Sequence, residues 1–448
     1  MRKRPSRLLV LAAAAVALVG ACSSDDTSGG QPVIEAAADV KAGPPVGWDS
    51  GGYEVDPASL KCSDTGSNPT RGITDTEIKV GGLAYLTSPN GSSMVGADVG
   101  AKVRFQRAND SGGVHGRTIN FIGTLDDGND PARNGQQAQA LAQQEQVFAV
   151  VPLLTSHTSY LDSFCKEGVP FFGWGFNPGY CGAALGFGIT GCQFPQDKVR
   201  STLYGVTISA MFDGDVEGRT TALVGVDNDS ARAGLLRLKN EIEAVGIDVV
   251  YAENPIPLTG LTDATAIVNE IMKSNKGGQP DVVLIVGDFN PVVKLTEALN
   301  AAGYTGKHLN PVGYDPRLAG FESLQNTYTI LQWQPGIDTD VPAIRQMADD
   351  FAKYAPGETI SLPAMAAYWS ADMFLDAIEK AGPDLTVDSL ISTLNSGEYS
   401  YYVEGAVPET RWPLNHNVNA PCGAVTLLQN QEYTIVSDLV CGSMVKLD

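Results

Sequence analysis

Three hydroxyl residues gather directly after one buried strand of the sequence. Thr155, Ser156 and Thr158 follow the apolar segment 147–152 and precede a helical pattern at 159–167. Free backbone amides at a helix start, together with hydroxyl donors, can bind a carboxylate or another hydrogen-bond acceptor. Ordinary N-capping accounts for only one such residue, so the pattern favours a binding loop over capping alone.

Strands and helices alternate along most of the chain. One series runs from the strand at 78–83 to the strand at 169–172, and a second runs from 221–226 to 309–312. Such alternation favours parallel sheets with helices on both faces. We therefore expect an α/β fold of two doubly wound units with a junction near 195–200. The expected helices are 92–109, 131–146, 159–167, 231–245, 262–274, 291–302, 342–354 and 364–381.

The position of such a fold's binding site follows from its topology. In an open parallel sheet, ligands bind beyond the carboxyl ends of the strands. Those ends carry Ser, Thr, Asp and Asn here, as in Asp288 and Asn290 after the strand at 282–286. The sequence therefore predicts a small-molecule site made by these loops.

Composition excludes several classes of protein. The chain has 448 residues, of which 43% are hydrophobic, which is too apolar for a disordered chain and long enough for two or three domains. Its 30 Lys and Arg stand against 51 Asp and Glu, a formal net charge of −21. Such a charge repels nucleic acids, so no nucleic-acid partner is expected.

Catalytic and metal motifs are not apparent. The sequence has no HExxH, GxSxG or P-loop, and its four His residues are scattered without a CxxC. The GxGxxG match at 186–191 is not placed between a strand and a helix, and we interpret it as a loop. His157 beside Ser156 is a weak nucleophile-and-base signal. We expect no cofactor, no metal and no enzymatic activity.

The N-terminus has the pattern of an export signal over residues 1–21. Basic residues precede the apolar run Leu8–Leu18, which is too short to span a bilayer. Val19–Cys22 resembles the bacterial lipobox, in which the Cys is diacylated; the alternative is an ordinary signal peptide cut near Ala21. Residues 22–72 then form a lipidated Cys and a flexible tether. We expect the protein on the outer face of the cytoplasmic membrane or in the periplasm.

Six further Cys residues remain, and outside the cytoplasm they are expected to form disulfides. Six Cys allow 15 pairings, among which sequence alone cannot choose. Proximity in sequence favours two pairs, and the third follows by elimination. The favoured pairs are Cys181–Cys192, Cys422–Cys441 and Cys62–Cys165.

A series of motifs resembles one known family. In order along the chain these are Ile78-Lys79-Val80-Gly81, Asn109, the turn Gly112–Arg117, Asp126-Asp127 and Thr155-Ser156. With these motifs the chain resembles the type I periplasmic binding proteins of the leucine/isoleucine/valine-binding group. The resemblance extends to about residue 440. The resemblance implies two lobes joined by a three-strand hinge, with a ligand held between them and delivered to an ABC importer. By this analogy lobe I is 73–196 plus 334–404 and lobe II is 197–333 plus 405–448.

The resemblance also implies roles for individual residues. Asn177 stands where the family has a Thr that contacts the ligand, and Ser230 where it often has a Tyr. Phe289 would pack on the ligand, and Asp315 would pair with an ammonium group unless it is only a turn residue before Pro316. The family's first loop Ser falls on Leu154. The full candidate ligand-binding set is Ser88, Thr155, Ser156, Thr158, Gly175, Phe176, Asn177, Ser230, Asp288, Phe289, Tyr314 and Asp315.

Three functions remain open from sequence. The preferred one is the solute receptor of an ABC importer, which binds an amino-acid-like, amide or carboxylate ligand without turnover. A surface sensory protein on the same fold would have the same sequence pattern. A secreted hydrolase that uses Ser156 is the enzymatic alternative.

Overall fold

The computed structural model describes residues 45–46, 53–194 and 199–446 of the chain. The predicted signal peptide, Cys22 and most of the predicted tether lie outside the described residues. Within the described ranges, none of the helices combines the length and apolar composition that crossing a membrane requires.

The first sheet consists of five parallel strands in the order β3-β2-β4-β5-β6. The first strand in sequence, β2, lies between β3 and β4, which are the next two strands along the chain. The strands are β2 (Glu77–Ala84), β3 (Thr118–Asp126), β4 (Ala149–Leu154), β5 (Phe171–Gly173) and β6 (Gly186–Gly188).

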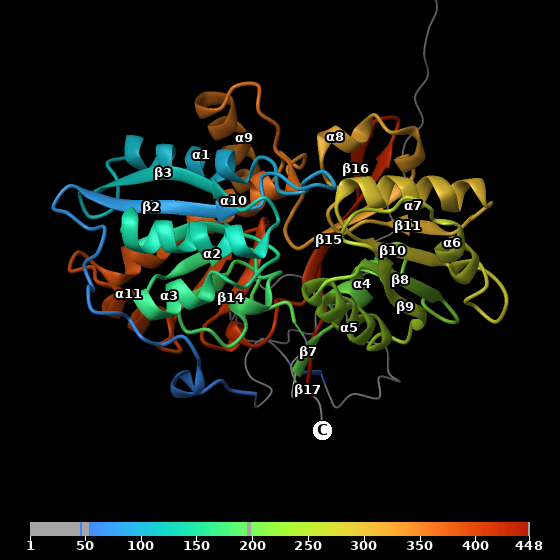
Figure 1. Cartoon of the computed structure of the whole chain (residues 1–448), viewed down its shortest axis with the longest axis horizontal. Coiled ribbons are helices and arrows are strands. Elements are labelled where there is room, and N and C mark those ends of the chain that lie inside the picture. The colour runs from blue at the N-terminus through green and yellow to red at the C-terminus, as the bar shows by residue number, and fades with distance from the viewer. Residues whose placement is uncertain (1–44, 47–52, 195–198, 447–448) are drawn as a thin grey trace, which may run out of the picture. The chain divides into compact units, whose positions relative to one another are not determined.

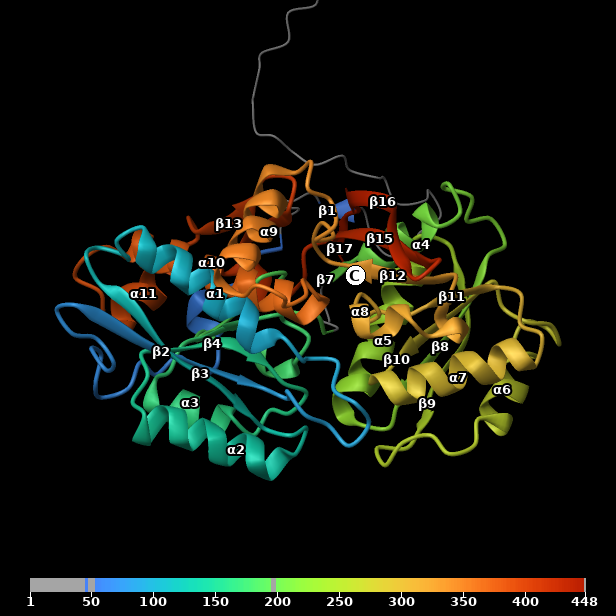
Figure 2. The ribbon, with the colours of Figure 1, turned by 90° about the horizontal axis from the view of Figure 1, so that it is seen from above.

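Helices cover both faces of the first sheet (Figures 1 and 2). Helices α1 (Ala97–Asp110) and α10 (Leu362–Ala381) lie on one face, and α2 (Pro131–Gln139) and α3 (Leu161–Glu167) lie on the other. Helix α10 comes from the C-terminal part of the chain, yet it packs on α1 and β4. Two further helices pack beside this pair, namely α9 (Pro342–Tyr354) against α1 and α11 (Val387–Leu394) against α10.

The second sheet has seven strands in the order β9-β8-β10-β11-β12-β15-β16. The strands from β9 to β12 are parallel, and the last two pair antiparallel. The strands are β8 (Thr220–Val226), β9 (Asp248–Ile256), β10 (Val282–Val286), β11 (Lys307–Leu309), β12 (Thr327–Leu331), β15 (Cys422–Gln429) and β16 (Glu432–Cys441).

The central strand β10 shows why its apolar run forms a buried strand. Side chains alternate between the two faces of a sheet. Val283 and Ile285 join the core cluster that contains residues of α6 (Thr265–Ile271) and α7 (Phe289–Ala301). Val282 and Leu284 join the cluster of the other face, formed with α4 (Leu203–Ala210) and α5 (Asp229–Glu243). Both faces are covered, so an uninterrupted apolar sequence is needed.

Short elements complete the fold. They are α8 (Pro316–Ala319), the hairpin β13 (Ser400–Val403) and β14 (Val407–Arg411), and a small sheet of β1 (Pro45–Val46), β17 (Met444–Lys446) and β7 (Val199–Ser201). The expected α/β class with two doubly wound parallel sheets is confirmed.

The same strand order occurs in both sheets. In each, the first strand in sequence lies between the second and the third, so the helices that follow the first and third strands leave to opposite faces. This is the topological switch point at which α/β sheets bind ligands. It lies between β2 and β4 in the first sheet and between β8 and β10 in the second.

Several element boundaries differ from the sequence prediction. Helix α1 begins at Ala97 rather than near residue 92, because the hydroxyls of Ser92 and Ser93 bind Tyr85 and Asp288 instead of capping a helix. Helix α3 begins at Leu161. Residues 186–188, expected as a loop, form strand β6. Helices α4 and α11 were not predicted; the first six residues of α4 are buried and leave no polar stripe to read.

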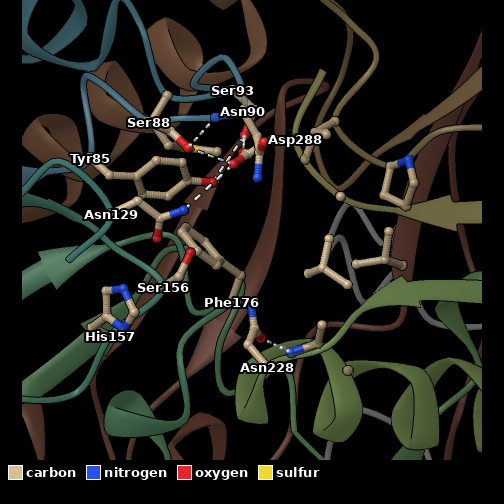
Figure 3. A pocket seen from close by; sticks show the side chains of 18 of the residues that line it. Tyr85, Ser88, Asn90, Ser93, Asn129, Ser156, His157, Phe176, Asn228 and Asp288 are labelled. Carbon is tan, nitrogen blue, oxygen red and sulfur yellow. Dashed lines mark hydrogen bonds between the residues drawn. The ribbon is translucent and has the colours of Figure 1, made fainter. Parts of the chain in front are cut away.

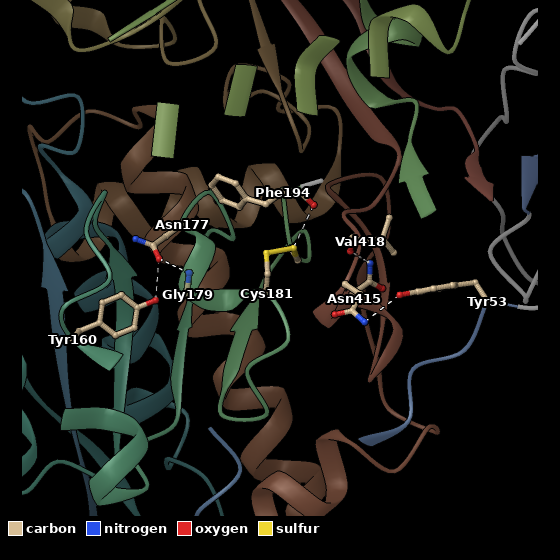
Figure 4. Close-up of a disulfide and its surroundings, with 10 residues drawn as sticks. Tyr53, Tyr160, Asn177, Gly179, Cys181, Phe194, Asn415 and Val418 are labelled. Carbon is tan, nitrogen blue, oxygen red and sulfur yellow. Dashed lines mark hydrogen bonds between the residues drawn. A yellow bond between two sulfur atoms is a disulfide. The ribbon is translucent and has the colours of Figure 1, made fainter. Parts of the chain in front are cut away.

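Three disulfides join the pairs that the sequence favoured. They are Cys62–Cys165, Cys181–Cys192 and Cys422–Cys441. Figure 4 shows the second of them beside Phe194, whose backbone oxygen lies 3.8 Å from the Cys192 sulfur. This bridge ties the segment that leaves the first sheet to the loop before β6.

Gly100 on α1 allows a close approach of two helices. A Cβ added there would lie 1.9 Å from the backbone oxygen of Ala364 on α10. We predict that Gly100→Ala lowers the free energy of unfolding by about 1–3 kcal/mol in urea denaturation, because the two helices must separate. Gly234→Ala on α5 is the control, since its methyl would meet no atom within 4 Å and should be neutral or slightly stabilising. Equal effects of the two substitutions would contradict this packing.

Candidate functional site

A cavity of about 330 Å³ lies at the carboxyl ends of the strands of both sheets. Its lining comes from the segments after β2, β3, β4 and β5 of the first sheet and after β8, β9, β10 and β11 of the second. Figure 3 shows Tyr85, Ser88, Asn129 and Asp288 gathered on one side of it, with Ser156 nearby. The cavity therefore occupies the place that the strand order of both sheets indicates.

Asp288 accepts hydrogen bonds from loops of the first sheet. It follows β10, and its Oδ2 accepts from Ser88 Oγ at 2.9 Å and from Asn129 Nδ2 at 3.5 Å. Its Oδ1 accepts from Ser93 Oγ at 3.3 Å. We name Ser88, Ser93, Asn129 and Asp288 the Asp288 cluster. The cluster links the loops after β2 and β3 to the loop after β10.

Backbone groups extend this link. The amides of Phe289 and Asn290, at the start of α7, donate to the carbonyls of Gly91 at 3.4 Å and Asn90 at 3.1 Å. The Asn90 side chain donates to the carbonyl of Leu258 at 2.7 Å. First-turn amides of a helix have no partner within the helix, so these carbonyls satisfy donors that would otherwise need water.

Burial changes the acidity of two groups in this region. Burial raises the pKa of Asp288 above its ordinary value, and the hydrogen bonds from Ser88 and Ser93 oppose that shift. Burial also raises the pKa of Tyr85, and the nearby Asp288 charge raises it further. Tyr85 is therefore a neutral phenol at neutral pH, with its hydroxyl 2.9 Å from Ser93 Oγ.

The loop that carries Ser156 is fixed from behind by buried polar groups. Thr155 Oγ1 donates to Asp127, which also accepts from Asn134 at 2.8 Å. Asn177 donates to the carbonyls of Thr155 at 2.9 Å and His157 at 2.7 Å. These bonds hold the backbone of residues 155–157 and leave Ser156 and His157 at the cavity.

Aromatic rings form the wall next to this loop. Trp174 and Phe176 line the cavity after β5, with ring centroids 5.2 Å apart. The indole of Trp174 donates to Gln332 Oε1 at 2.9 Å and packs edge-on against Trp333. The ring of Trp174 is therefore held by the segment that follows β12.

One face of α5 forms the opposite wall. Ala231, Gly234 and Leu238 line the cavity at helical spacing, and Asn228 caps the helix by accepting from the amide of Ala231 at 2.7 Å. Ala231 and Gly234 carry little or no side chain. This part of the wall consequently leaves space for a ligand.

Comparison with known proteins identifies the family. A family model described as periplasmic binding protein matches residues 77–431. The chain belongs to the periplasmic binding protein family. The family and fold predicted from sequence are thus confirmed. No curated protein has a sequence similar enough to match.

Solved structures share the fold of this periplasmic binding protein. A fatty acid ABC transporter substrate-binding protein from Thermomonospora curvata is 20% identical, with 84% of this chain and 96% of that chain covered and a TM-score of 0.64. A leucine binding protein from Thermotoga maritima is 15% identical (81% and 99% covered, TM-score 0.60). A solute binding protein from R. palustris in complex with benzoate is also 15% identical (82% and 98% covered, TM-score 0.58). At these identities the likeness concerns the fold alone.

Four of the residues proposed from sequence line the cavity of this periplasmic binding protein. They are Ser88, Ser156, Phe176 and Asp288, from four different strand ends. Among the described residues that line the cavity, sequence reasoning did not single out Tyr85, Asn129, Asn228 or Arg237. Asn129 and Asn228 follow strands as polar loop residues, which is a signal that could have found them. Nothing in the sequence marks Arg237, which lies within α5.

Other proposed residues of the first sheet act behind the cavity. Thr155 and Asn177 are buried and use their side chains to hold the loop described above. Thr158 is exposed, and the first turn of α3 begins only at Leu161, so the expected hydroxyl cluster at a helix start does not form. Gly175 is needed for packing, since a Cβ there would lie 1.9 Å from the carbonyl of Gly191.

The proposed residues near α8 also lie away from the cavity lining. Asp315 caps α8 by accepting from the amide of Arg317 at 2.8 Å, and its carboxylate pairs with the Arg317 guanidinium. That guanidinium lies over the ring of Phe289, which is buried in the core of the second sheet. Tyr314 is buried against Tyr433. These contacts agree with the alternative in which Asp315 is a turn residue before Pro316, and its carboxylate is already paired with Arg317.

The last proposed residue is Ser230, and the last point is the absence of a metal cluster among the described residues. Ser230 lies in the first turn of α5, and its side chain is outside what the structure describes. Among the described residues, no group of three His, Cys, Asp or Glu side chains could hold a metal ion.

The raised pKa of Asp288 gives a pH-dependent prediction. An acid whose pKa is raised on folding destabilises the fold when ionised; the deficit is absent below its ordinary pKa of 3.8 and complete above the raised pKa. We predict that Asp288→Asn raises the free energy of unfolding at pH 7, because the neutral amide does not bury a charge. The gain should shrink as the pH falls towards 4.

Chemical denaturation at pH 7 and pH 4 measures this effect. Asp75→Asn removes an exposed carboxylate and serves as the matched control. A loss of stability at pH 7 in Asp288→Asn would show instead that the ionised carboxylate stabilises the cluster.

Proposed function

We propose that this periplasmic binding protein is an extracytoplasmic receptor that captures a small amino-acid-like, amide or carboxylate ligand and delivers it to an ABC importer. The observation that carries the proposal is the cavity, which lies where the carboxyl ends of strands from two switch-point sheets meet. The family match over residues 77–431 supports the same activity.

Lobe I consists of 73–196 plus 334–404 and lobe II of 197–333 plus 405–448 in this proposal. Three passages of the chain between the two sheets support a two-lobe division: β6 to β8, β12 to α9 with α10, and β14 to β15. The last passage lies after β14 and not at 404/405, because β14 pairs with β13 and Val407 belongs to the core of the first sheet. The hinge lies in these passages. Closure brings the Asp288 cluster together and encloses the ligand, as in hinge motions generally.

The protein acts by binding and not by catalysis in this proposal. The family consists of binding proteins. Solved structures with the same fold include a substrate-binding protein of a fatty acid ABC transporter, a leucine binding protein and a solute binding protein in complex with benzoate. Such varied ligands on one fold mean that the ligand of this chain must be inferred from its own cavity.

Thermal stability offers the most direct test of ligand capture. The mature chain is heated in the presence of amino acids, amides and carboxylic acids, each in excess. A ligand at about 100-fold over its Kd should add about 2.7 kcal/mol of stability. Gly234→Leu should abolish the shift, because its side chain enters the cavity from α5.

Lys239→Leu is the control for this substitution. It places the same side chain on α5 outside the cavity lining and should keep the shift. Binding that survives in Gly234→Leu would mean that the ligand occupies another site, and turnover of any amide or ester would contradict a pure receptor.

The membrane attachment of the protein forms a separate part of the proposal. Cleavage before Cys22 and acylation of its thiol would anchor the protein on the outer face of the cytoplasmic membrane. We predict that Cys22→Ala moves the protein from the membrane to the soluble fraction and ends incorporation of labelled palmitate. An unmodified protein that fractionates as soluble before the substitution would contradict the anchor.

A further inference from the structure

The charges that line the cavity are few. Among the described lining residues, Asp288 is the only acid, and Arg237 is the only Arg or Lys. Asp288 already accepts hydrogen bonds from three side chains of the first sheet. A ligand ammonium group would therefore have to displace the Asp288 cluster to find a carboxylate.

Arg237 is different, because two of its three guanidinium nitrogens have no hydrogen-bond partner. Its residue surface is only 9% exposed, and its Nε and Nη1 have no hydrogen-bond partner. The carboxylate of Glu241, one turn further along α5, lies 3.7 Å from Nη1, which is ion-pair distance but longer than a hydrogen bond. The guanidinium also lies over the ring of Tyr204, 5.0 Å from its centroid.

These contacts surround the guanidinium but leave its Nε and Nη1 donors without a hydrogen-bond acceptor. A buried donor without a partner costs about 1–3 kcal/mol, and more when it is charged. Glu241 supplies charge balance, since it is buried and its other oxygen accepts from the amide of Tyr204 at 2.9 Å. The N–H groups on Nε and Nη1 are still without acceptors. Both nitrogens are covered by protein, so an anion in the cavity would reach them once the Arg237 side chain turns towards it. A guanidinium binds a carboxylate with a fork of two parallel bonds.

The rest of the wall is mainly apolar. Trp174, Phe176, Phe194, Leu238, Val286 and Val312 line the cavity together with the small residues of α5. Polar side chains line the cavity as well, among them Ser156, His157, Gln193 and Asn228. An apolar ligand body is favoured by this surface, because it removes hydrocarbon from water without leaving ligand polar groups unpaired.

We infer that the ligand is an apolar monocarboxylate whose carboxylate binds the Arg237 guanidinium and whose hydrocarbon body lies between the aromatic wall and α5. The inference rests on the proposed receptor function and narrows its ligand class. A zwitterionic amino acid fits less well, because the lining offers its ammonium group no carboxylate other than the engaged Asp288. Arg237 is then the residue that sets the preference for a negative charge.

Isothermal titration calorimetry of the mature chain tests this inference with matched probes. Octanoate and benzoate are the acids, octanamide and benzamide are their neutral counterparts, and octylamine and leucine carry an ammonium group. At least one acid should bind, its amide should bind at least tenfold more weakly, and the two ammonium compounds should not compete. Arg237→Met should weaken binding of the acid at least tenfold and leave binding of the amide unchanged.

Two further variants separate binding from folding. Arg237→Met leaves Glu241 buried without its cation, so the double variant Arg237→Met/Glu241→Gln removes both charges and should show the same selective loss. Arg232→Met removes an Arg from the exposed side of α5, outside the cavity lining, and should bind like the unmodified chain. Thermal unfolding of each variant establishes that it is folded before titration.

The outcomes distinguish this inference from the receptor proposal. Failure of both acids to bind, tighter binding of leucine or octylamine, or an equal loss of acid and amide binding in the Arg237 variants would overturn the role of Arg237. Leucine binding would still leave the receptor proposal intact. Only the failure of every compound in the wider thermal screen would count against the receptor itself.

Discussion

A carboxylate between the two sheets receives its hydrogen bonds from one side only. Asp288 follows a strand of the second sheet, and its three side-chain donors all belong to loops of the first. Burial makes the ionised acid expensive unless those donors are in place. The position of the loops after β2 and β3 is therefore coupled to the loop after β10, and the cavity exists in its described form only while they meet.

The supports behind these loops explain why so many polar residues surround the cavity without facing it. Asp127, Asn134, Thr155 and Asn177 satisfy one another and the backbone of the Ser156 loop. A buried network of this kind is stable only if every member has a partner. Its residues are therefore fixed by structure, and the side chains that remain for a ligand are those whose donors the fold leaves unused.

The fold was readable from the sequence because burial on both faces imposes a strong pattern. The run Val282–Val286 needs no partner to identify it as a central strand. Helix starts were less predictable, because the hydroxyls of Ser92 and Ser93 could cap a helix or bind elsewhere. In the structure, Ser92 donates to the backbone oxygen of Tyr85 and Ser93 donates to Asp288.

The site was readable only in part. Loops after strands could be located, which brought Ser88, Ser156 and Asp288 into the candidate set. A small change in the backbone angles of a loop decides whether a polar side chain faces the cavity or packs behind it. The sequence therefore could not show that Asn177 binds the loop backbone and that Asp315 pairs with Arg317. Arg237 could not be found at all, since helical periodicity gives its face but not what that face meets.

Small residues on one face of α5 have a consequence for how such a receptor can change. Ala231 and Gly234 take no part in the Asp288 cluster, and an added methyl at Gly234 would touch nothing. In the proposed receptor, the size of the ligand would thus be limited by a wall that is separate from the Asp288 cluster. Substitutions along this single helix would then change ligand selectivity in small steps without altering the hydrogen bonds of the Asp288 cluster.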